Sequence, residues 1–144
     1  RQRQMCIRDR VRIDLIVRGI CCLIPGRKYS RNIRVTRIVD TFLEHARVWY
    51  FGNGGKPKLF LGSPDWMRRN LYRRIEAVTP ILDPDLKREL SDMLSIQLSD
   101  KRKACFVDDH LRNRWKSARP QKEKVRAQYT FYEYLKSGEL KVES

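Results

Sequence analysis

The sequence lacks several features that would place it in a protein class immediately. No apolar run approaches the roughly 20 residues that a membrane-spanning helix requires. There is no phosphate-binding loop of the GxxxxGKS, GxxxxGKT or GxGxxG type, and no group of Cys and His has the spacing of a metal site. We therefore expect no transmembrane helix, no metal held by this chain and no conventional nucleotide loop.

Acidic residues are scarce, because 17 Asp and Glu stand against 32 Lys and Arg and leave a formal net charge of +15. The excess lies early in the chain: residues 11–80 hold 14 basic and 5 acidic side chains, whereas residues 81–144 hold 14 and 11. Such a charge favours a polyanionic partner, and nucleic acid, anionic lipid and polyphosphate all qualify. A basic surface that only keeps the protein in solution explains the charge equally well.

Cysteine is also infrequent, with four residues at positions 6, 21, 22 and 105. Adjacent Cys21 and Cys22 are poorly placed to pair with each other, and the spacing is not that of a small disulfide-bonded domain. We therefore expect reduced thiols and a cytoplasmic setting, in which peripheral contact with a membrane surface is compatible with the charge.

The apolar pattern over residues 11–144 predicts one α/β domain, with a mixed β-sheet flanked by helices. Residues 1–10 carry little periodicity and are set aside as a non-native remnant. Alternation predicts strands in VRIDLIV, NIRVTRIV, ARVWYF, KLFLGS, RRIEAVTPIL and KACFV, and GNGGKP predicts a hairpin turn. The abrupt first strand indicates a domain truncated at its N-terminus.

Helical spacing predicts two helices and one helical turn. The clearest helix covers residues 83–100, with Asp83 as its cap and an apolar stripe in the core formed by Leu86, Leu90, Met93, Leu94 and Leu98. A second helix is expected at residues 121–137, stopped by Gly138, with an inward face formed by Val125, Tyr129, Tyr132 and Leu135. The short turn is expected around Ile38, Val39, Phe42 and Leu43, and the charged run after KACFV is expected to be a loop.

Of the two histidines, His45 has the setting of a functional residue. A lone histidine is more often structural, and His110 in the polar run DDHLRN is expected to lie in solvent. His45 directly precedes the strand ARVWYF, where strand periodicity places Arg47 on the same face, and a GSPD turn follows the next strand. An imidazole can move a proton or a phosphoryl group, and a guanidinium can neutralise phosphoryl oxygens. This grouping of a histidine, a cation and the small hydroxyl of the GSPD turn predicts a phosphoryl-transfer site.

Five further arginines are candidate anion ligands. Arg18 follows a buried strand and precedes Gly19, which allows close approach of an anion, although a surface arginine at a turn is the plainer explanation. The run RRNLYRR could line a polyanion path or form a solvated basic face, through Arg68, Arg69, Arg73 and Arg74, and Arg47 is a further candidate for the same path. Interleaved aromatic residues leave open a second function, a non-catalytic module that binds single-stranded nucleic acid.

Three segments carry a closer resemblance, namely IDLIVRGICCLIPG, NIRVTRIVDTFLEHARVWYFGNGG and LFLGSPDWMRRNLYRRIEAVTPI. They resemble the C-terminal domain of the long-form, bacterial-type polyphosphate kinase family from about Val11 to Cys105, and residues 106–144 match it only loosely. The resemblance implies a lobe with a phospholipase D-like fold. It also implies ATP as substrate and reversible transfer of its terminal phosphate to inorganic polyphosphate through a phosphohistidine.

The same resemblance assigns roles to two residues of this chain. It implies that Arg18, in the RGxCCL-like motif, contacts ATP or phosphate, and that His45, in the FLEHxR motif, transfers a proton or binds phosphate. The phosphorylated histidine and the groups that bind Mg²⁺ are expected outside this chain, so the chain alone is expected to be inactive. A homo-oligomer with polyphosphate and no nucleic acid as partner is implied for the whole protein.

Overall fold

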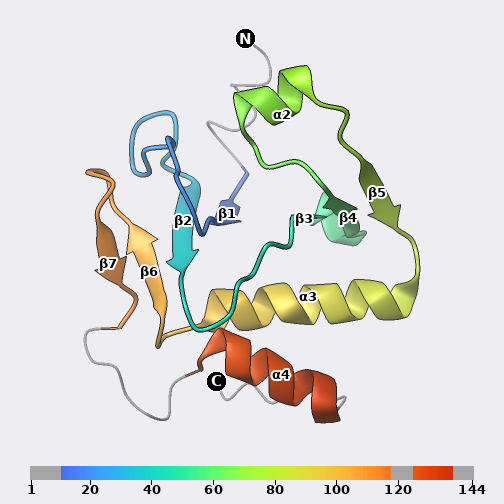
Figure 1. Ribbon diagram of the computed structural model, residues 1–144. Helices are drawn as coiled ribbons and strands as arrows, with labels where there is room; N and C mark the ends of the chain where they lie inside the picture. Colours follow the sequence, from blue (N-terminus) through green and yellow to red (C-terminus); the bar gives the residue numbers. More distant parts are fainter. Residues whose placement is uncertain (1–10, 118–124, 138–144) are drawn as a thin grey trace. The chain divides into compact units, whose positions relative to one another are not determined.

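The computed structural model describes residues 11–117 and 125–137, which form two units (Figure 1). One unit combines Arg1–Phe42 with Ser95–Ser144, and the other is Leu43–Leu94; they are called unit 1 and unit 2 below. Each unit has its own β-sheet, so the single mixed sheet expected from the pattern is in fact two sheets. The expected α/β class, with both helices and β-sheets, is confirmed.

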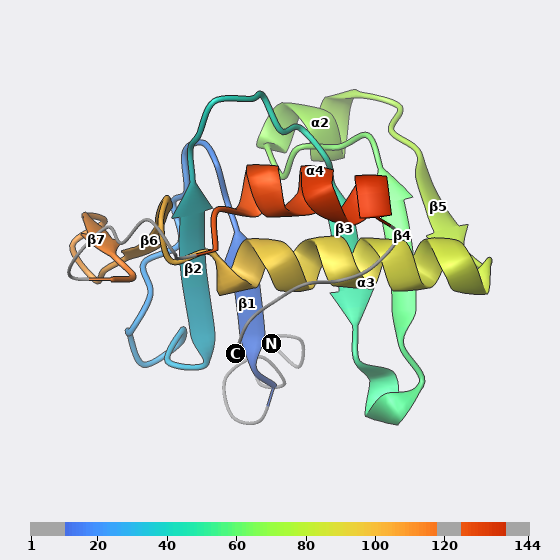
Figure 2. The ribbon, with the colours of Figure 1, turned by 90° about the horizontal axis from the view of Figure 1, so that it is seen from below.

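The sheet of unit 1 has four strands in the order β1, β2, β6, β7. The strands β1 (Ile13–Ile16) and β2 (Ile33–Ile38) run parallel, with Ile13 opposite Ile33 (Figure 2). β6 (Ala104–Val107) and β7 (Asn113–Trp115) continue the sheet antiparallel. The alternation in the sequence predicted β1, β2 and β6 correctly. Apolar residues of β2 and β6 are buried in the core of this unit, and β1 is half-buried along its whole length.

The strand β7 was expected to be part of a loop. A tight turn makes it a strand: Leu111 has a positive φ of 61°, and the Asp108 carboxylate accepts hydrogen bonds from the backbone N–H groups of His110 and Arg112. The turn reverses the chain and lets Asn113–Trp115 pair with β6. The polar composition of the run concealed this strand, since all three of its residues are exposed and show no apolar alternation.

The sheet of unit 2 is an antiparallel meander of β3 (Val48–Phe51), β4 (Lys58–Gly62) and β5 (Val78–Ile81). The predicted hairpin is confirmed, and Figure 2 shows the short helix η1 (Asn53–Gly55) in its turn. Gly54 and Gly55 have φ values of 62° and 87°, which explains why the turn is rich in glycine. The helix α2 (Arg68–Arg73) lies between β4 and β5 in the sequence.

The helix α3 (Pro84–Ser99) begins as predicted, because the Asp83 carboxylate accepts hydrogen bonds of 2.9 Å from the N–H groups of Asp85 and Leu86. Its expected core stripe is only partly buried. Leu86 and Leu98 are exposed, and the fully buried residue of the helix is Ile96.

The last helix, α4 (Ala127–Ser137), is present, but its inward face was predicted wrongly. Tyr129, Tyr132 and Leu135 are exposed, whereas Ala127 and Gln128 are buried. Polar contacts at the first turn decide this orientation, since Ala127 and Gln128 bond to residues far away in the sequence. Gly138 and residues 1–10 lie outside the described residues, so these two expectations stay predictions.

The predicted helical turn around Ile38 to Leu43 is wrong. Ile38 ends β2, and the following residues have no helical structure. The Phe42 N–H and C=O groups both bond to the side chain of Gln128 instead of to neighbouring backbone groups. Apolar spacing could not reveal a partner 86 residues away.

Across residues 11–117 and 125–137, no helix is both long enough and apolar enough to cross a membrane. Within the same ranges, Cys21, Cys22 and Cys105 are free cysteines.

Candidate active site

The site predicted around His45 lies where the first strand of unit 2 begins. The Gly62 N–H donates to the Arg47 carbonyl over 3.1 Å, so the residue before β3 is already paired with the end of β4. This ladder fixes the Arg47 backbone and leaves the exposed His45 three residues before the first residue of β3. The two side chains, both chosen from the sequence, are thus presented from one short stretch of extended chain.

Arg47 holds His45 and Asp65 at the same time. Its Nη2 lies 2.5 Å from His45 Nε2, and its Nε donates to Asp65 Oδ1 over 3.0 Å. An arginine can only donate, so His45 Nε2 accepts and carries no proton in this arrangement. We infer from this contact that the neutral imidazole bears its proton on Nδ1.

Asp65 fixes the guanidinium that orients His45. The hydrogen bond from Arg47 holds the pKa of the Asp65 carboxyl below its ordinary value, against a smaller opposing effect of burial, and the charges of Arg47 and Arg69 lower it further. Asp65 is therefore ionised at neutral pH and remains paired with Arg47. Half-buried partners such as these orient each other more than they stabilise the fold.

The backbone around Asp65 is held by the buried Asn70. The Asn70 side-chain amide donates to the Asp65 carbonyl over 3.2 Å, and the Met67 N–H donates to the same oxygen over 2.7 Å. Asn70 is only 4% exposed although it lies among arginines in α2. The sequence drew attention to the GSPD turn but did not single out Asp65 or Asn70. Arg47 meets Asp65 only when β3 and β4 pair, and Asn70 contacts a backbone carbonyl, which no sequence motif indicates.

The serine of the GSPD turn does not join His45, contrary to expectation. The Ser63 hydroxyl donates to the Glu76 carboxylate and accepts from the Ala77 N–H over 3.1 Å. It therefore ties the end of β4 to the approach to β5. The group beside His45 consists of a cation and a carboxylate, without a small hydroxyl.

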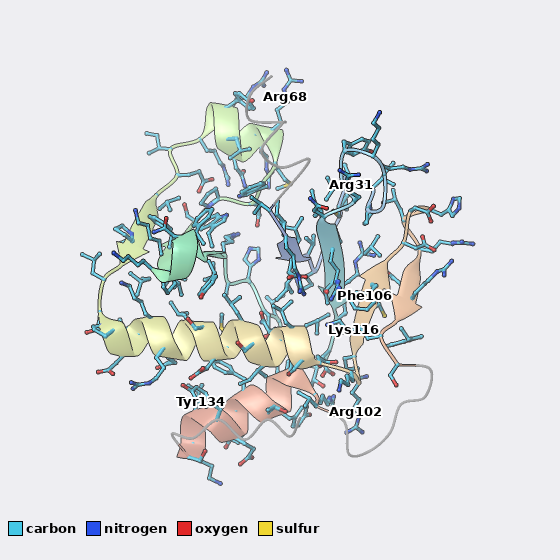
Figure 3. All side chains as sticks on the ribbon, turned by 180° about the vertical axis from the view of Figure 1, so that it is seen from behind. Arg31, Arg68, Arg102, Phe106, Lys116 and Tyr134 are labelled. Atoms are coloured by element: carbon cyan, nitrogen blue, oxygen red, sulfur yellow. The ribbon has the colours of Figure 1, made fainter. Side chains whose placement is uncertain are left out.

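The predicted arginine path lies on and just after α2. Arg68, Arg69 and Arg73 are helical and Arg74 is the C-cap, and all four are exposed. Figure 3 shows Arg68 pointing away from the helix. Within the described ranges none of the four forms an ion pair with a carboxylate, while Arg69 is close enough for its charge to lower the Asp65 pKa. The four guanidinium groups are thus free to meet an anion.

Arg18 belongs to unit 1, whereas His45, Arg47 and the α2 arginines belong to unit 2. Arg18 is exposed and follows Val17, whose N–H donates to the Thr36 carbonyl over 2.9 Å at the end of the β1–β2 ladder. The next carbonyl, that of Gly19, accepts a 3.0 Å hydrogen bond from Arg37. Arg37 was not identified from the sequence, where it appears only as a polar position of β2.

The described residues offer no place for a metal ion of their own. No group of three or more His, Cys, Asp or Glu side chains among residues 11–117 and 125–137 could hold one. A cavity of about 610 Å³ in unit 1 is lined by Arg12, Arg31 and Arg34 among other residues, and none of the predicted site residues lines it.

Comparison with known proteins identifies the family of this chain. The family described as "Polyphosphate kinase C-terminal domain 2" matches residues 8–128. The polyphosphate kinase of Escherichia coli (strain K12) is 49% identical over 130 residues, which cover 90% of this chain and 19% of that protein. The polyphosphate kinase of Synechocystis sp. is 57% identical over 95 residues, which cover 65% of this chain and 13% of that protein.

A solved structure shows the same fold. The crystal structure of polyphosphate kinase from Porphyromonas gingivalis matches with a TM-score of 0.84 and 58% identity, covering 89% of this chain and 20% of that chain. The chain thus spans 19% or less of the length of the two curated relatives. On the extent of the family match and the identity to its members, the chain belongs to the polyphosphate kinase C-terminal domain family.

Proposed function

We propose that this chain is part of a polyphosphate kinase that reversibly transfers the terminal phosphate of ATP to inorganic polyphosphate. The observation that carries the proposal is the contact of Arg47 with both His45 and Asp65, which presents an exposed, oriented imidazole in the same unit as the exposed arginines of α2. Family membership supplies the substrate class, because the matching relatives are named polyphosphate kinases.

In the proposed reaction, a histidine outside this chain attacks the terminal phosphorus of ATP and ADP leaves. The phosphoryl group then passes from that phosphohistidine to the terminal oxygen of a polyphosphate chain, and the reverse sequence regenerates ATP. His45 exchanges a proton with a phosphate oxygen during transfer, and its Nδ1 proton is the one available when Nε2 is held by Arg47. Arg18 contributes a guanidinium to ATP or phosphate.

The α2 arginines form the proposed approach path for polyphosphate. Linear polyphosphate carries about one negative charge per phosphate unit, and unpaired guanidinium groups bind phosphate oxygens with well-directed hydrogen bonds. Mg²⁺ is expected to enter with the nucleotide and to be held outside this chain. Self-association of the whole protein and its peripheral contact with membranes stay predictions.

The test uses a chimera, in which this chain replaces the matching 130 residues of the Escherichia coli enzyme. ATP-dependent polyphosphate synthesis is measured with His45 intact, with His45→Ala and with His110→Ala as the matched control, since these are the chain's two histidines. We expect His45→Ala to lower kcat by at least about 100-fold, the usual contribution of a positioned acid or base, and His110→Ala to change it less than about twofold. Full activity of the His45→Ala chimera would reduce His45 to a structural residue.

Further experiments distinguish the proposed kinase function from that of a nucleic-acid-binding module. The isolated chain should neither become phosphorylated by ATP nor make polyphosphate, because its nucleophile lies elsewhere. Replacing Arg68 and Arg69 with Gln should raise the KM of the chimera for polyphosphate, whereas Arg88→Gln, at an exposed arginine paired with Asp85, should not. Binding of single-stranded DNA that polyphosphate cannot displace would favour the module instead.

A further inference from the structure

The cavity of about 610 Å³ in unit 1 lies at the start of β2. Among the described residues that line it, three are arginines, none is Asp or Glu, and none has been given a role above. The arginines are Arg12, Arg31 and Arg34, all exposed, and Figure 3 shows Arg31 beside the start of β2. The buried Val35 and Val107 also line the cavity, which has the size of a small-molecule site. It therefore combines three cations with an apolar wall.

Asp14 holds two of the three arginines in place. Its Oδ2 accepts from Arg12 Nε over 3.0 Å, and its Oδ1 lies 3.9 Å from Arg34 Nε. The Asp14 side chain is 22% exposed, whereas those of Arg12 and Arg34 are 72% and 54% exposed. Both contacts engage Nε, and the described residues provide no hydrogen bond to the Nη groups of either arginine. One carboxylate thus orients two guanidinium groups whose outer N–H groups are available to an anion.

An aromatic ring of β6 also fixes Arg34. The Arg34 Cζ lies 5.3 Å from the centroid of the Phe106 ring, and Lys116 Nζ lies 5.1 Å from the same centroid (Figure 3). Lys116 is itself held, because its Nζ donates to the Leu98 carbonyl over 2.8 Å. The Arg34 guanidinium is therefore positioned by a ring and a carboxylate before any ligand binds, which lowers the entropic cost of binding.

The loop before β2 forms another part of the cavity wall, and Ser30 holds this loop in place. The Ser30 hydroxyl donates to the Ile24 carbonyl over 2.6 Å and accepts from the Arg27 N–H over 3.1 Å. The Ile33 N–H donates to the Ser30 carbonyl over 3.0 Å. Ser30 is only 1% exposed, so water does not compete for these bonds. The backbone that carries Arg31, the next residue, is therefore well defined.

We propose that this cavity binds a linear chain of phosphate groups, as found in a nucleoside triphosphate and in inorganic polyphosphate, through Arg12, Arg31 and Arg34. Guanidinium groups match phosphate oxygens with paired hydrogen bonds, and several of them suit a ligand that carries several charges. The apolar wall strengthens these bonds by excluding water from one side. The inference rests on the proposed function for the choice of phosphate chains among anions, and it adds a site to which that function assigns no residue.

The test follows the backbone amide NMR signals of Gly26, Ile33 and Val107, which line the cavity, in the ¹⁵N-labelled chain. Inorganic tripolyphosphate, ATP or adenosine is added without Mg²⁺, which would neutralise the phosphate charges. We expect both phosphate chains, and not adenosine, to shift these signals to saturation. ATP binding at least about tenfold tighter than tripolyphosphate would identify a nucleotide whose base lies on the apolar wall, and otherwise the inorganic chain is the ligand. Absence of a saturable shift with either chain would overturn the proposal.

Substitution by lysine separates a guanidinium site from a general effect of charge. Arg34→Lys and Arg31→Lys each keep the positive charge but lose the two-pronged donor, so each should weaken tripolyphosphate binding about tenfold, the effect of one lost hydrogen bond between charged groups. Arg112→Lys, at an exposed arginine of unit 1 outside the cavity lining, is the matched control and should change binding less than about twofold. The spread of amide signals reports whether each variant is folded. Folded variants at positions 31 and 34 that bind as well as the control would overturn the proposal.

Two results keep this proposal distinct from its alternatives. Absence of binding at the cavity would refute the site and leave the proposed function intact, because that function is read from the kinetics of the His45→Ala chimera. A fully active His45→Ala chimera would instead refute the proposed function, whatever the cavity binds. Single-stranded DNA that shifts the same three signals and is not displaced by tripolyphosphate would overturn the assignment to phosphate chains.

Discussion

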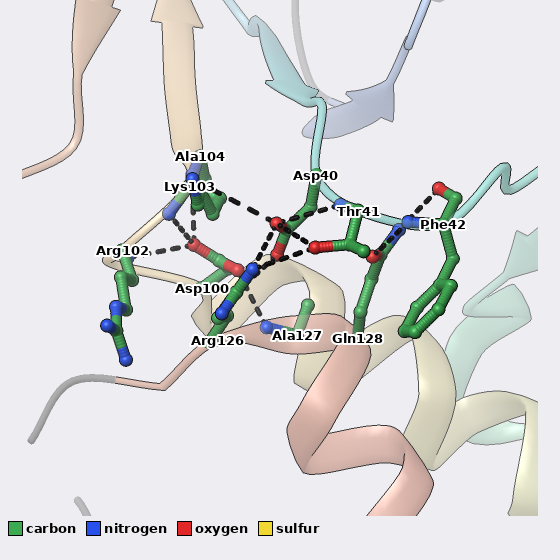
Figure 4. A network of polar contacts seen from close by, with 10 residues as sticks. All are labelled: Asp40, Thr41, Phe42, Asp100, Arg102, Lys103, Ala104, Arg126, Ala127 and Gln128. Carbon is green, nitrogen blue, oxygen red and sulfur yellow. Dashed lines mark hydrogen bonds and ion pairs between the residues drawn. The ribbon is translucent and has the colours of Figure 1, made fainter. Parts of the chain in front are cut away.

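The buried carboxylate of Asp100 should be the most costly side chain of unit 1 to remove. Its Oδ1 accepts from the N–H groups of Arg102, Lys103 and Ala104 over 2.9, 2.6 and 2.9 Å, and its Oδ2 accepts from Ala127 over 2.7 Å (Figure 4). One fully buried side chain therefore joins the end of α3, the start of β6 and the first residue of α4. Asp100→Ala removes all four hydrogen bonds.

The magnitude follows from the burial of the donors. Ala104 and Ala127 are 0% and 1% exposed, so their N–H groups cannot turn to water when the carboxylate is absent. Each buried, unsatisfied donor costs about 1–3 kcal/mol, which gives about 2–6 kcal/mol for Asp100→Ala. Asp100→Asn keeps one carbonyl oxygen but places an NH₂ group against one donor, so it should cost about 1–3 kcal/mol. Asp83→Ala, which removes an exposed helix cap, should cost about 1 kcal/mol.

The assay is urea unfolding of this chain at pH 7, followed by far-ultraviolet circular dichroism. The free energy of unfolding should fall in the order wild type, Asp83→Ala, Asp100→Asn and Asp100→Ala, with the m-value unchanged for variants that fold. If Asp100→Ala is unfolded without urea, Asp100→Asn still gives a measurable transition. An Asp100→Ala variant as stable as Asp83→Ala would refute the reasoning, because it would mean that the four N–H groups do not depend on this carboxylate.

Three further predictions concern single elements of the fold. Gly62→Ala should destabilise the chain by about 1–3 kcal/mol, because a Cβ atom there would lie 2.6 Å from a tryptophan ring of β3, whereas Gly52→Ala, in open space, should be neutral in the same urea titration. The Asp108 pKa is lowered chiefly by hydrogen bonds from backbone N–H groups of the turn, so the ionised carboxylate stabilises the folded chain above about pH 4, and this stabilisation is lost as the pH falls through the depressed pKa. In the Asp108→Asn variant, the free energy of unfolding should therefore depend less on pH below about pH 4. Exposed Cys22 should be alkylated by iodoacetamide in the folded chain, as read by peptide mass spectrometry, whereas Cys105 should react only after unfolding because it is buried and burial raises its pKa.

Features governed by neighbouring residues could be predicted from the sequence alone. The alternation of β1, the glycine-rich turn between β3 and β4, and the Asp83 cap of α3 all depend on contacts within a few residues or on the burial of one face. The pairing of His45 with Arg47 also follows from their separation by two residues in extended chain. The motif order predicted the family, which the comparisons confirm.

Tertiary contacts decided what the local pattern could not. Phe42 is not helical because its backbone bonds to Gln128, and the same contact turns Gln128 inward and leaves Tyr129 exposed, contrary to the apolar spacing of α4. Asp65 became part of the site only when β4 brought it to Arg47. In each case a polar group found its partner far along the chain, and apolar periodicity carries no information about such partners. The sequence therefore determined the elements and the family, whereas the folded chain determined which distant polar groups bond to Phe42 and to Arg47.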